Sequence, residues 1–77
     1  MNKLVIDVWD KTTTPTRVAT ILNALNRTQA QLADVLGVTF VTVNRWVNGH
    51  SVPDARSRKM LERLEDVYIH GKQSETA

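Results

Sequence analysis

Apolar residues recur every three or four positions along four stretches of this 77-residue chain, which is the spacing of helices that bury one face. The first stretch, residues 16–26, follows Pro15, whose ring discourages a helical conformation at Thr14. Its apolar positions are Val18, Ile21, Leu22 and Leu25. The pattern predicts a first helix over residues 16–26 that packs against the rest of the domain.

A second helix is predicted between Thr28 and Gly37. Thr28 and Gln31 fit a capping box, in which each side chain accepts a hydrogen bond from the backbone amide of the other residue. Gly37 takes a left-handed conformation without steric cost and ends the helix. The residues expected on its packed side are Leu32, Val35 and Leu36, with the small Ala33 allowing close approach of a neighbouring helix.

A third helix is predicted to begin almost at once, because Thr39 offers a new N-cap only two residues after Gly37. The pair Asn48 and Gly49 tolerates the positive φ that closes a helix. The positions that share one inward stripe are Val43, Trp46 and Val47. The positions left pointing outward are Val41, Asn44, Arg45 and Asn48, with Phe40 at the border. So short a turn forces a steep crossing of the two helices, as in helix-turn-helix units.

A last helix is predicted to open near Pro53 and Asp54, because proline suits a first turn and an acidic side chain is favoured near the positive end of the helix dipole. Ser51 is expected to cap this helix and Gly71 to end it. Residues 72–77 are expected to form a frayed polar tail. The inward positions are Leu61, Leu64 and Tyr68, with Met60 at the edge.

The N-terminal residues 3–10 follow the period of a β-strand, with Leu4, Ile6 and Val8 on one side. A single strand has no partner within a helical domain. One hypothesis is that it pairs with the same segment of a second copy and supports a dimer. The other is that Ile6 and Trp9 pack against their own bundle. The predicted organisation is an extended arm or strand over residues 1–14, a helical domain over residues 15–71 and the tail.

Length and composition favour a small binding module. Seventy-seven residues suit one domain that buries roughly 60 to 65% of its unfolded surface, too little to enclose a deep catalytic cavity. The chain has no cysteine, which excludes disulfides and thiolate metal sites and favours an intracellular protein. Asp7 ends the longest apolar run near the N-terminus, so no signal peptide or membrane span is expected and the predicted location is the cytoplasm.

Candidate chemistry for an enzyme is missing from the sequence. His50 and His70 lack metal-spaced partners, and no glycine-rich phosphate loop occurs. Ser51 fits a cap better than a nucleophile, and Trp46 stands at core spacing rather than in a ligand cage. No enzymatic activity, cofactor or metal is therefore expected.

The net charge of +2 is a weak argument for a nucleic-acid partner, but its distribution is more informative. Residues 11–63 carry eight basic and three acidic side chains, a net charge of +5. The flanking segments are net negative. The positive field is therefore centred on the two short central helices, where it attracts phosphates.

Residues 16–66 resemble the phage-repressor family, the Cro-like or Xre-type helix-turn-helix proteins. The matching positions are Gln29, Ala33, Gly37, Val38, Thr39, Thr42, Val43, Trp46, Asn48, Gly49 and Pro53. The resemblance implies an all-α, compact, lambda-repressor-like domain of four or five helices that binds double-stranded DNA. One departure is Val47, where many relatives carry glutamate.

The resemblance also implies which residues meet DNA. In the family, the positions equivalent to Phe40, Val41 and Arg45 usually touch bases, and those equivalent to Gln29 and Asn48 usually bind phosphates. Arginine pairs with guanine, and Asn44 on the same face carries the amide that pairs with adenine. Because Phe40 and Val41 are more apolar than the usual readers, contact with thymine methyl groups is expected there.

Further phosphate contacts are expected from hydroxyl and basic groups near the two helix starts and the following loop. These candidates are Thr28, Thr39, Thr42, His50 and Arg56. His50 is either a phosphate ligand or an ordinary exposed loop residue. Arg56 either contacts the DNA backbone, as is typical of the family, or lies on a solvated face of the last helix.

Two classes of function fit these observations. In the first, the protein is a transcription regulator, most simply a repressor that binds a palindromic operator as a homodimer, with half-sites about 34 Å apart. In the second, it is an antitoxin or adaptor that binds DNA and also a protein partner through the segment from Leu4 to Trp9.

Overall fold

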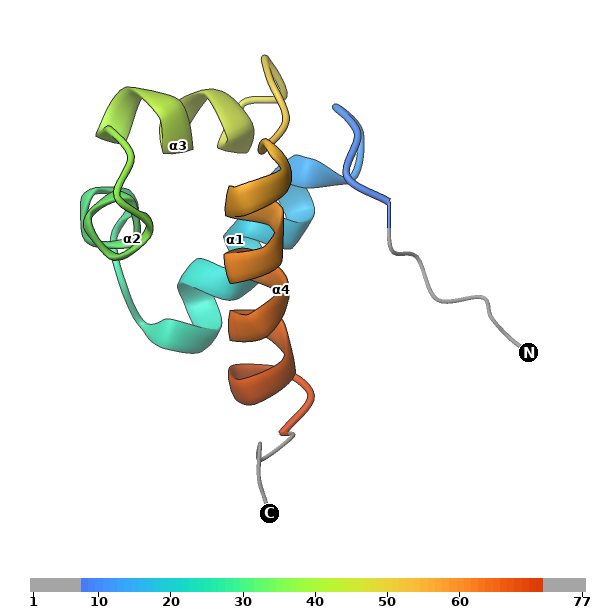
Figure 1. Cartoon of the computed structure of the whole chain (residues 1–77), viewed down its shortest axis with the longest axis vertical. Coiled ribbons are helices and arrows are strands. Elements are labelled where there is room, and N and C mark those ends of the chain that lie inside the picture. Colours follow the sequence, from blue (N-terminus) through green and yellow to red (C-terminus); the bar gives the residue numbers. More distant parts are fainter. Residues whose placement is uncertain (1–7, 72–77) are drawn as a thin grey trace.

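The computed structural model describes residues 8–71, and within this range the chain forms four α-helices and no strand (Figure 1). The helices are α1 (Thr14–Leu25), α2 (Gln29–Leu36), α3 (Phe40–Val47) and α4 (Ala55–Tyr68). The predicted all-α fold is confirmed, with four helices rather than five. Most of the strand predicted over residues 3–10 lies outside the described residues, and residues 8–10 are not in a strand.

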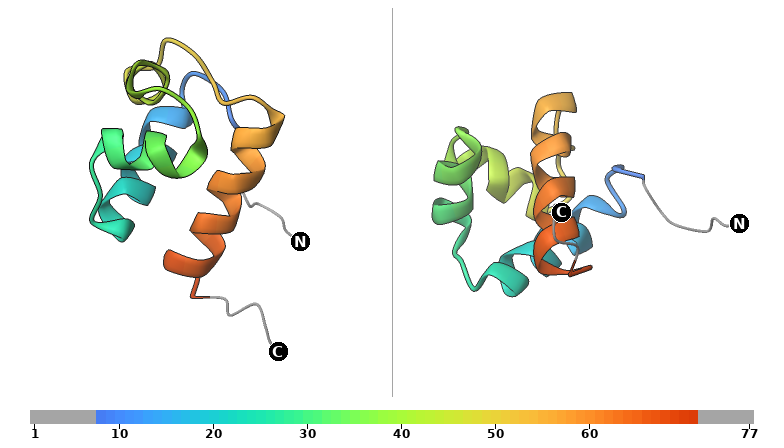
Figure 2. Two further views of the ribbon diagram at one scale, coloured as in Figure 1. Left: turned by 60° about the vertical axis from the view of Figure 1, so that its left-hand side comes forward. Right: turned by 60° about the horizontal axis from the view of Figure 1, so that its bottom comes forward.

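The core lies where α1 packs on α3 and on α4, and where α2 packs on α3. Figure 2 shows α2 and α3 as two short helices beside the longer α4. The fully or almost fully buried apolar side chains are Val18, Ile21, Leu32, Ala33, Leu36, Val43, Trp46 and Leu61. All eight stand at positions that the helical periodicity assigns to the inside, and Val47 packs against them half-buried, as predicted.

The start of α1 differs from the prediction, because the helix begins at Thr14 and not after Pro15. Asp10 organises this start: its carboxylate accepts hydrogen bonds from the amides of Thr12 and Thr13 at 2.9 and 2.7 Å. The amide of Thr14 donates to the carbonyl of Asp10 at 2.9 Å. Pro15 is tolerated because it stands in the first turn, where an amide proton is not needed.

The segment that precedes α1 is tied to α4 by a polar cluster around Arg17. The guanidinium of Arg17 binds Glu65 through Nε at 2.9 Å and through a second nitrogen at 2.6 Å, and it stacks 3.8 Å from the ring centre of Trp9. The Trp9 indole donates to Glu62 at 3.0 Å, and Arg17 also donates to the carbonyl of Val8 at 3.0 Å. These contacts make Trp9 part of its own bundle, as one of the two hypotheses expects, whereas Ile6 lies outside the described residues.

Gly49, directly after α3, holds this helix close to the start of α1. Its φ is +75°, and a Cβ atom there would lie 3.3 Å from the carbonyl oxygen of Lys11 and 3.6 Å from the Pro15 ring. Lys11 is four residues before Pro15, whose missing amide proton leaves that carbonyl without its usual helical donor. Glycine therefore satisfies both the backbone conformation and the close approach.

The last helix differs from the prediction at both ends. Its cap is Asp54, which accepts a hydrogen bond from the amide of Ser57 at 2.9 Å, and not Ser51. The helix ends at Tyr68, three residues before Gly71: the amide of Ile69 makes the last helical bond, to the carbonyl of Glu65, and the amide of His70 bonds this same carbonyl instead of continuing the helical pattern. No helix within residues 8–71 has the length and apolar composition needed to cross a membrane.

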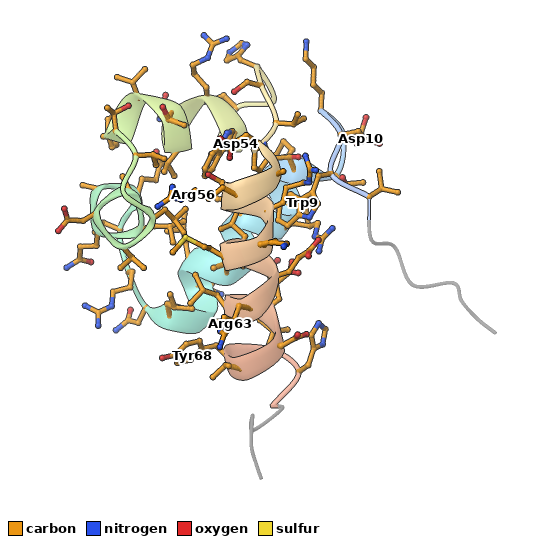
Figure 3. The ribbon with its side chains drawn as sticks, viewed as in Figure 1. Trp9, Asp10, Asp54, Arg56, Arg63 and Tyr68 are labelled. Atoms are coloured by element: carbon orange, nitrogen blue, oxygen red, sulfur yellow. The ribbon has the colours of Figure 1, made fainter. Side chains whose placement is uncertain are left out.

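Two apolar side chains that were expected inside are exposed. Tyr68 is the last residue of α4, where the helix ends, and 57% of its surface is exposed (Figure 3). Val35 on α2 is 53% exposed, because Leu32 and Leu36 already fill the side that packs on α3. A helix of only eight residues offers a narrow buried stripe.

The Asp54 cap makes part of the stability depend on pH. The hydrogen bond from the Ser57 amide is the main cause that lowers the pKa of Asp54 below its usual value. Because the carboxylate has a lower pKa in the folded than in the unfolded chain, it stabilises the fold at pH values above the unfolded pKa. This stabilisation is lost as the pH falls through the folded pKa.

We expect Asp54→Asn, which keeps a capping oxygen, to lower the melting temperature near pH 7 and to have a smaller effect near pH 3. Thermal unfolding followed by circular dichroism at both pH values measures the difference. Asp66→Asn, which removes an exposed carboxylate from the same helix, is the control. An Asp54→Asn effect that is equal at both pH values would contradict the assigned cap.

Candidate nucleic-acid interface

Helix α3 lies at the edge of the molecule, with one face packed and one face open (Figure 1). Val43 and Trp46, at 0% and 2% exposure, hold it against the core. On the opposite side Val41 is 62% exposed and Arg45 is exposed. The orientation predicted from the sequence is therefore confirmed for these four residues.

The angle between α2 and α3 is set by the turn over residues 37–39. Gly37 has a φ of +73° and its amide caps α2 through the carbonyls of Ala33 and Asp34, as predicted. Thr39 begins α3, and its hydroxyl oxygen accepts a hydrogen bond from the amide of Thr42 at 3.2 Å. The capping box of Thr28 and Gln31 is also present, with bonds of 3.1 and 2.9 Å.

The first turn of α3 presents apolar side chains to solvent. Phe40 is 51% exposed, and Val41 follows it with a still larger exposed fraction. One turn further on, the guanidinium of Arg45 makes no hydrogen bond or ion pair with any residue between 8 and 71. Its donor groups are therefore available to an external acceptor.

Asn44 departs from the prediction, because it is half-buried instead of pointing freely outward. Its amide nitrogen donates to the side-chain oxygen of Gln29 at 3.0 Å, which links α3 to the start of α2. The side-chain amide nitrogen of Asn48 donates to the side-chain oxygen of Asn44 at 3.1 Å and to the backbone carbonyl of Asn44 at 2.8 Å. The three amides form a chain across the interface, so Asn44 positions Gln29 and Asn48.

The hydroxyl candidates stand at the starts of the two helices. Thr28 and Thr39 are exposed caps, and their oxygens accept hydrogen bonds from the helix amides. Thr42 is half-buried, with its hydroxyl 3.0 Å from that of Thr39. The Thr28 hydroxyl accepts through one lone pair, so its proton can bind a phosphate oxygen, whereas the bond between Thr39 and Thr42 uses one of their two hydroxyl protons and leaves the other for a phosphate.

His50 and Arg56 differ in how far their side chains are already engaged. His50 is exposed in the loop after α3, and its one hydrogen bond within the described residues is from its backbone amide to the carbonyl of Arg45 at 2.9 Å. Arg56 is exposed on α4 and reaches toward α2, where it donates to the carbonyl of Leu36 at 3.3 Å (Figure 3). Arg56 therefore compensates the negative end of the α2 dipole.

An open groove of about 820 Å³ lies between α1 and the start of α2. Hydroxyl and amide side chains line much of it, with Gln29 at one end. No group of three or more histidine or acidic side chains that could hold a metal ion occurs within residues 8–71. The groups suited to binding are therefore the donors on α2 and α3.

These features define a class of protein. Two capped helices, joined by a turn of three residues and crossing so that one presents an open face, are a helix-turn-helix DNA-binding domain. The electrostatics agree, because none of the eight residues of α3 is acidic and the central part of the chain is basic.

Comparison with known proteins gives the family. The model of a helix-turn-helix family matches residues 18–68, and the chain belongs to this family, of the Cro/Xre type. Its members are DNA-binding regulators of transcription, and this chain carries their DNA-binding domain. No curated protein and no solved structure matches the chain.

Several contacts around the interface were not predicted from the sequence. They are the bond between Asn44 and Gln29, the bond from Arg56 to Leu36 and the cluster of Arg17 with Glu65. Each joins residues at least 15 positions apart, and no local pattern signals such a pairing. For the bond between Asn44 and Gln29 the sequence offers one signal. Asn44 is a polar residue at the edge of the inward stripe of its helix, so it faces the preceding helix.

Proposed function

We propose that the chain is a sequence-specific repressor that binds a palindromic operator as a homodimer. The observation that carries this proposal is the exposed face of α3, where Val41 and Arg45 point to solvent while Trp46 anchors the helix from behind. An α-helix of this kind fits the major groove of B-DNA. Occupation of an operator in this way blocks access to an overlapping promoter.

Base recognition is assigned to the first half of α3 and to Arg45. The free guanidinium donates two parallel hydrogen bonds to guanine O6 and N7. Phe40 and Val41 contact thymine methyl groups, because an exposed apolar side chain gains from covering another apolar group. Asn44 acts indirectly, because its hydrogen bonds hold Gln29 and Asn48 in place.

Phosphate contacts are assigned to groups that flank this face. They come from Thr28, Gln29, Thr39, Thr42, Asn48, His50 and Arg56. Thr28 and Gln29 stand at the start of α2 and Thr39 and Thr42 at the start of α3, where free backbone amides and the helix dipole also favour a negative group. Asn48 and His50 stand at the other end of α3, so the contacts bracket the helix.

A homodimer suits this small reading surface. One short helix covers few base pairs, and each good pair of hydrogen bonds contributes roughly 1 to 3 kcal/mol of discrimination. Two copies on a palindrome double the contacts. We assign dimerisation to the N-terminal segment, whose described end is held against α1 and α4 by Trp9 and whose remaining residues lie outside the described range.

Selection of bound duplexes from a random DNA pool, followed by substitutions, tests the proposed function. We expect two inverted half-sites with centres about 34 Å apart. Arg45→Ala should abolish the preference for one guanine in each half-site, whereas Gln29→Ala should weaken binding to all sequences more evenly. Dissociation constants on a panel of duplexes with single base changes measure both effects.

Arg63→Ala is the matched control for charge, because Arg63 is exposed on α4, away from α3 (Figure 3). The preferred base should stay the same in this variant, and its overall affinity should change by less than about twofold. If Arg45→Ala and Gln29→Ala changed the affinities in the same pattern, the assigned roles would be wrong. A full-length protein that enriched no sequence from the pool would contradict the proposed function itself.

The dimer assignment is tested by removing residues 1–7, which leaves Trp9 and its contacts with Arg17 and Glu62 in place. We expect this truncated chain to sediment as a monomer and to bind the full palindrome much more weakly, while its affinity for a single half-site stays the same. Sedimentation equilibrium and titration of both duplexes measure these changes. A truncated chain with the mass and affinity of the full chain would refute this assignment.

The alternative is an antitoxin or adaptor that holds a protein partner through the segment from Leu4 to Trp9. It makes a different prediction for the full-length and truncated chains. It requires that a second protein co-purifies in stoichiometric amount with the full chain and is lost from the truncated one. The contacts of Trp9 count against this alternative only at Trp9 itself, because that side chain is already bound within its own domain while the proposed homodimer uses the same segment.

A further inference from the structure

The exposed apolar side chains at the start of α3 call for a physical reason. Phe40 and Val41 leave more than half of their surfaces in water, although the same eight-residue helix buries Val43 and Trp46 almost completely. Apolar surface in water carries a cost of roughly 25 cal/mol per Å² that is recovered when a partner covers it. A partner that offers apolar groups to this part of α3 therefore gains free energy by covering it.

The position of Arg45 narrows the chemistry of that partner. Residues four apart lie one above the other on a helix, so Val41 and Arg45 share one exposed stripe. An apolar surface and an exposed guanidinium are thus presented side by side, about 6 Å apart at their Cβ atoms. A ligand that satisfies both offers a methyl group next to a pair of hydrogen-bond acceptors.

In the major groove of DNA, one arrangement offers these groups together. A guanine presents O6 and N7 as acceptors, and a pyrimidine on its 5′ side places the C5 substituent beside them. When that substituent is a methyl group, it lies within reach of both the guanidinium bound to the guanine and the apolar side chain one turn earlier. Thymine carries this methyl group, and 5-methylcytosine carries the same group at the same ring position.

We propose that α3 reads a 5-methylated pyrimidine followed on the same strand by guanine, and that it accepts thymine and 5-methylcytosine alike while discriminating against uracil and unmethylated cytosine. This inference rests on the proposed function and specifies its ligand. Its consequence is that methylation of one cytosine strengthens binding at sites where that cytosine replaces the thymine. The protein then responds to the methylation state of DNA.

The surroundings of the apolar pair favour DNA over a protein surface. Phe40 and Val41 are flanked by Thr39 and Thr42, whose hydroxyls suit phosphates, and α3 contains no acidic side chain. A protein-binding face centred on these residues would require a continuous apolar surface. Here the stripe turns polar within one helical turn, at Arg45.

The experiment uses four versions of one selected operator, which differ only at the base 5′ of the guanine that Arg45 recognises. This guanine is the one whose preference is lost in Arg45→Ala. The four bases are thymine, uracil, cytosine and 5-methylcytosine. We expect equal affinities for the two methylated bases and about fourfold weaker binding for each unmethylated counterpart, which equals about 0.8 kcal/mol for one buried methyl group.

Two valine variants show whether α3 is responsible. In Val41→Ala the ratio between methylated and unmethylated duplexes should fall below about twofold, because the covering side chain is removed. Val35→Ala is the matched control, since it truncates another valine that is more than half exposed, on α2, and should leave the ratio unchanged. Both residues are on the surface, so both variants should melt near the temperature of the unmodified chain.

The outcomes are distinct. Equal affinity for all four duplexes, or a ratio that survives Val41→Ala, would overturn this inference while DNA binding by α3 stands. If the Arg45→Ala variant kept the guanine preference, the inference would likewise be overturned while DNA binding by α3 stands. If Val41→Ala altered self-association in sedimentation and left the affinities unchanged, the apolar pair would be a contact between protein copies. A protein that binds none of the duplexes would overturn both the inference and the proposed function.

Discussion

The structure depends on one constraint, the three-residue turn between α2 and α3. Gly37 reverses the chain with a positive φ, and Thr39 starts the next helix before the chain can move away. With the crossing of the helices fixed in this way, Val43 and Trp46 enter the core, and Val41 and Arg45 are necessarily turned outward. The reading face is therefore a consequence of the packing behind it.

The other end of α3 is held by contacts with the N-terminal segment. Gly49 lies against the carbonyl of Lys11, and the turn that contains Lys11 is fixed to α1 by Asp10. The ion pair of Arg17 with Glu65 then ties α1 to α4, with side-chain exposures of only 15% and 11%. A domain of this size has a small core, so such polar links between helices contribute to a rigid position for the recognition helix.

Local patterns predicted the elements well, because caps and periodicity depend on neighbours in sequence. The capping box at Thr28 and the exit at Gly37 are examples. The errors arise where tertiary packing decides. Val35 and Tyr68 have helical spacing but stay more than half exposed, and Asn44 turns toward Gln29 because α2 passes beside it. The base and phosphate roles depend on DNA, and neither the sequence nor the fold contains the operator.

The central claim is that DNA covers the outer face of α3 while its inner face stays packed. Titration of the isotopically labelled protein with a selected operator duplex, followed by nuclear magnetic resonance, tests this claim most directly. The account predicts that the largest signal changes occur at the side chains of Val41 and Arg45 and at the start of α2, while the methyl signals of Ile21 and Leu61 in the core stay in place. Changes confined to the end of α4 around Tyr68, with α3 unaffected, would contradict it.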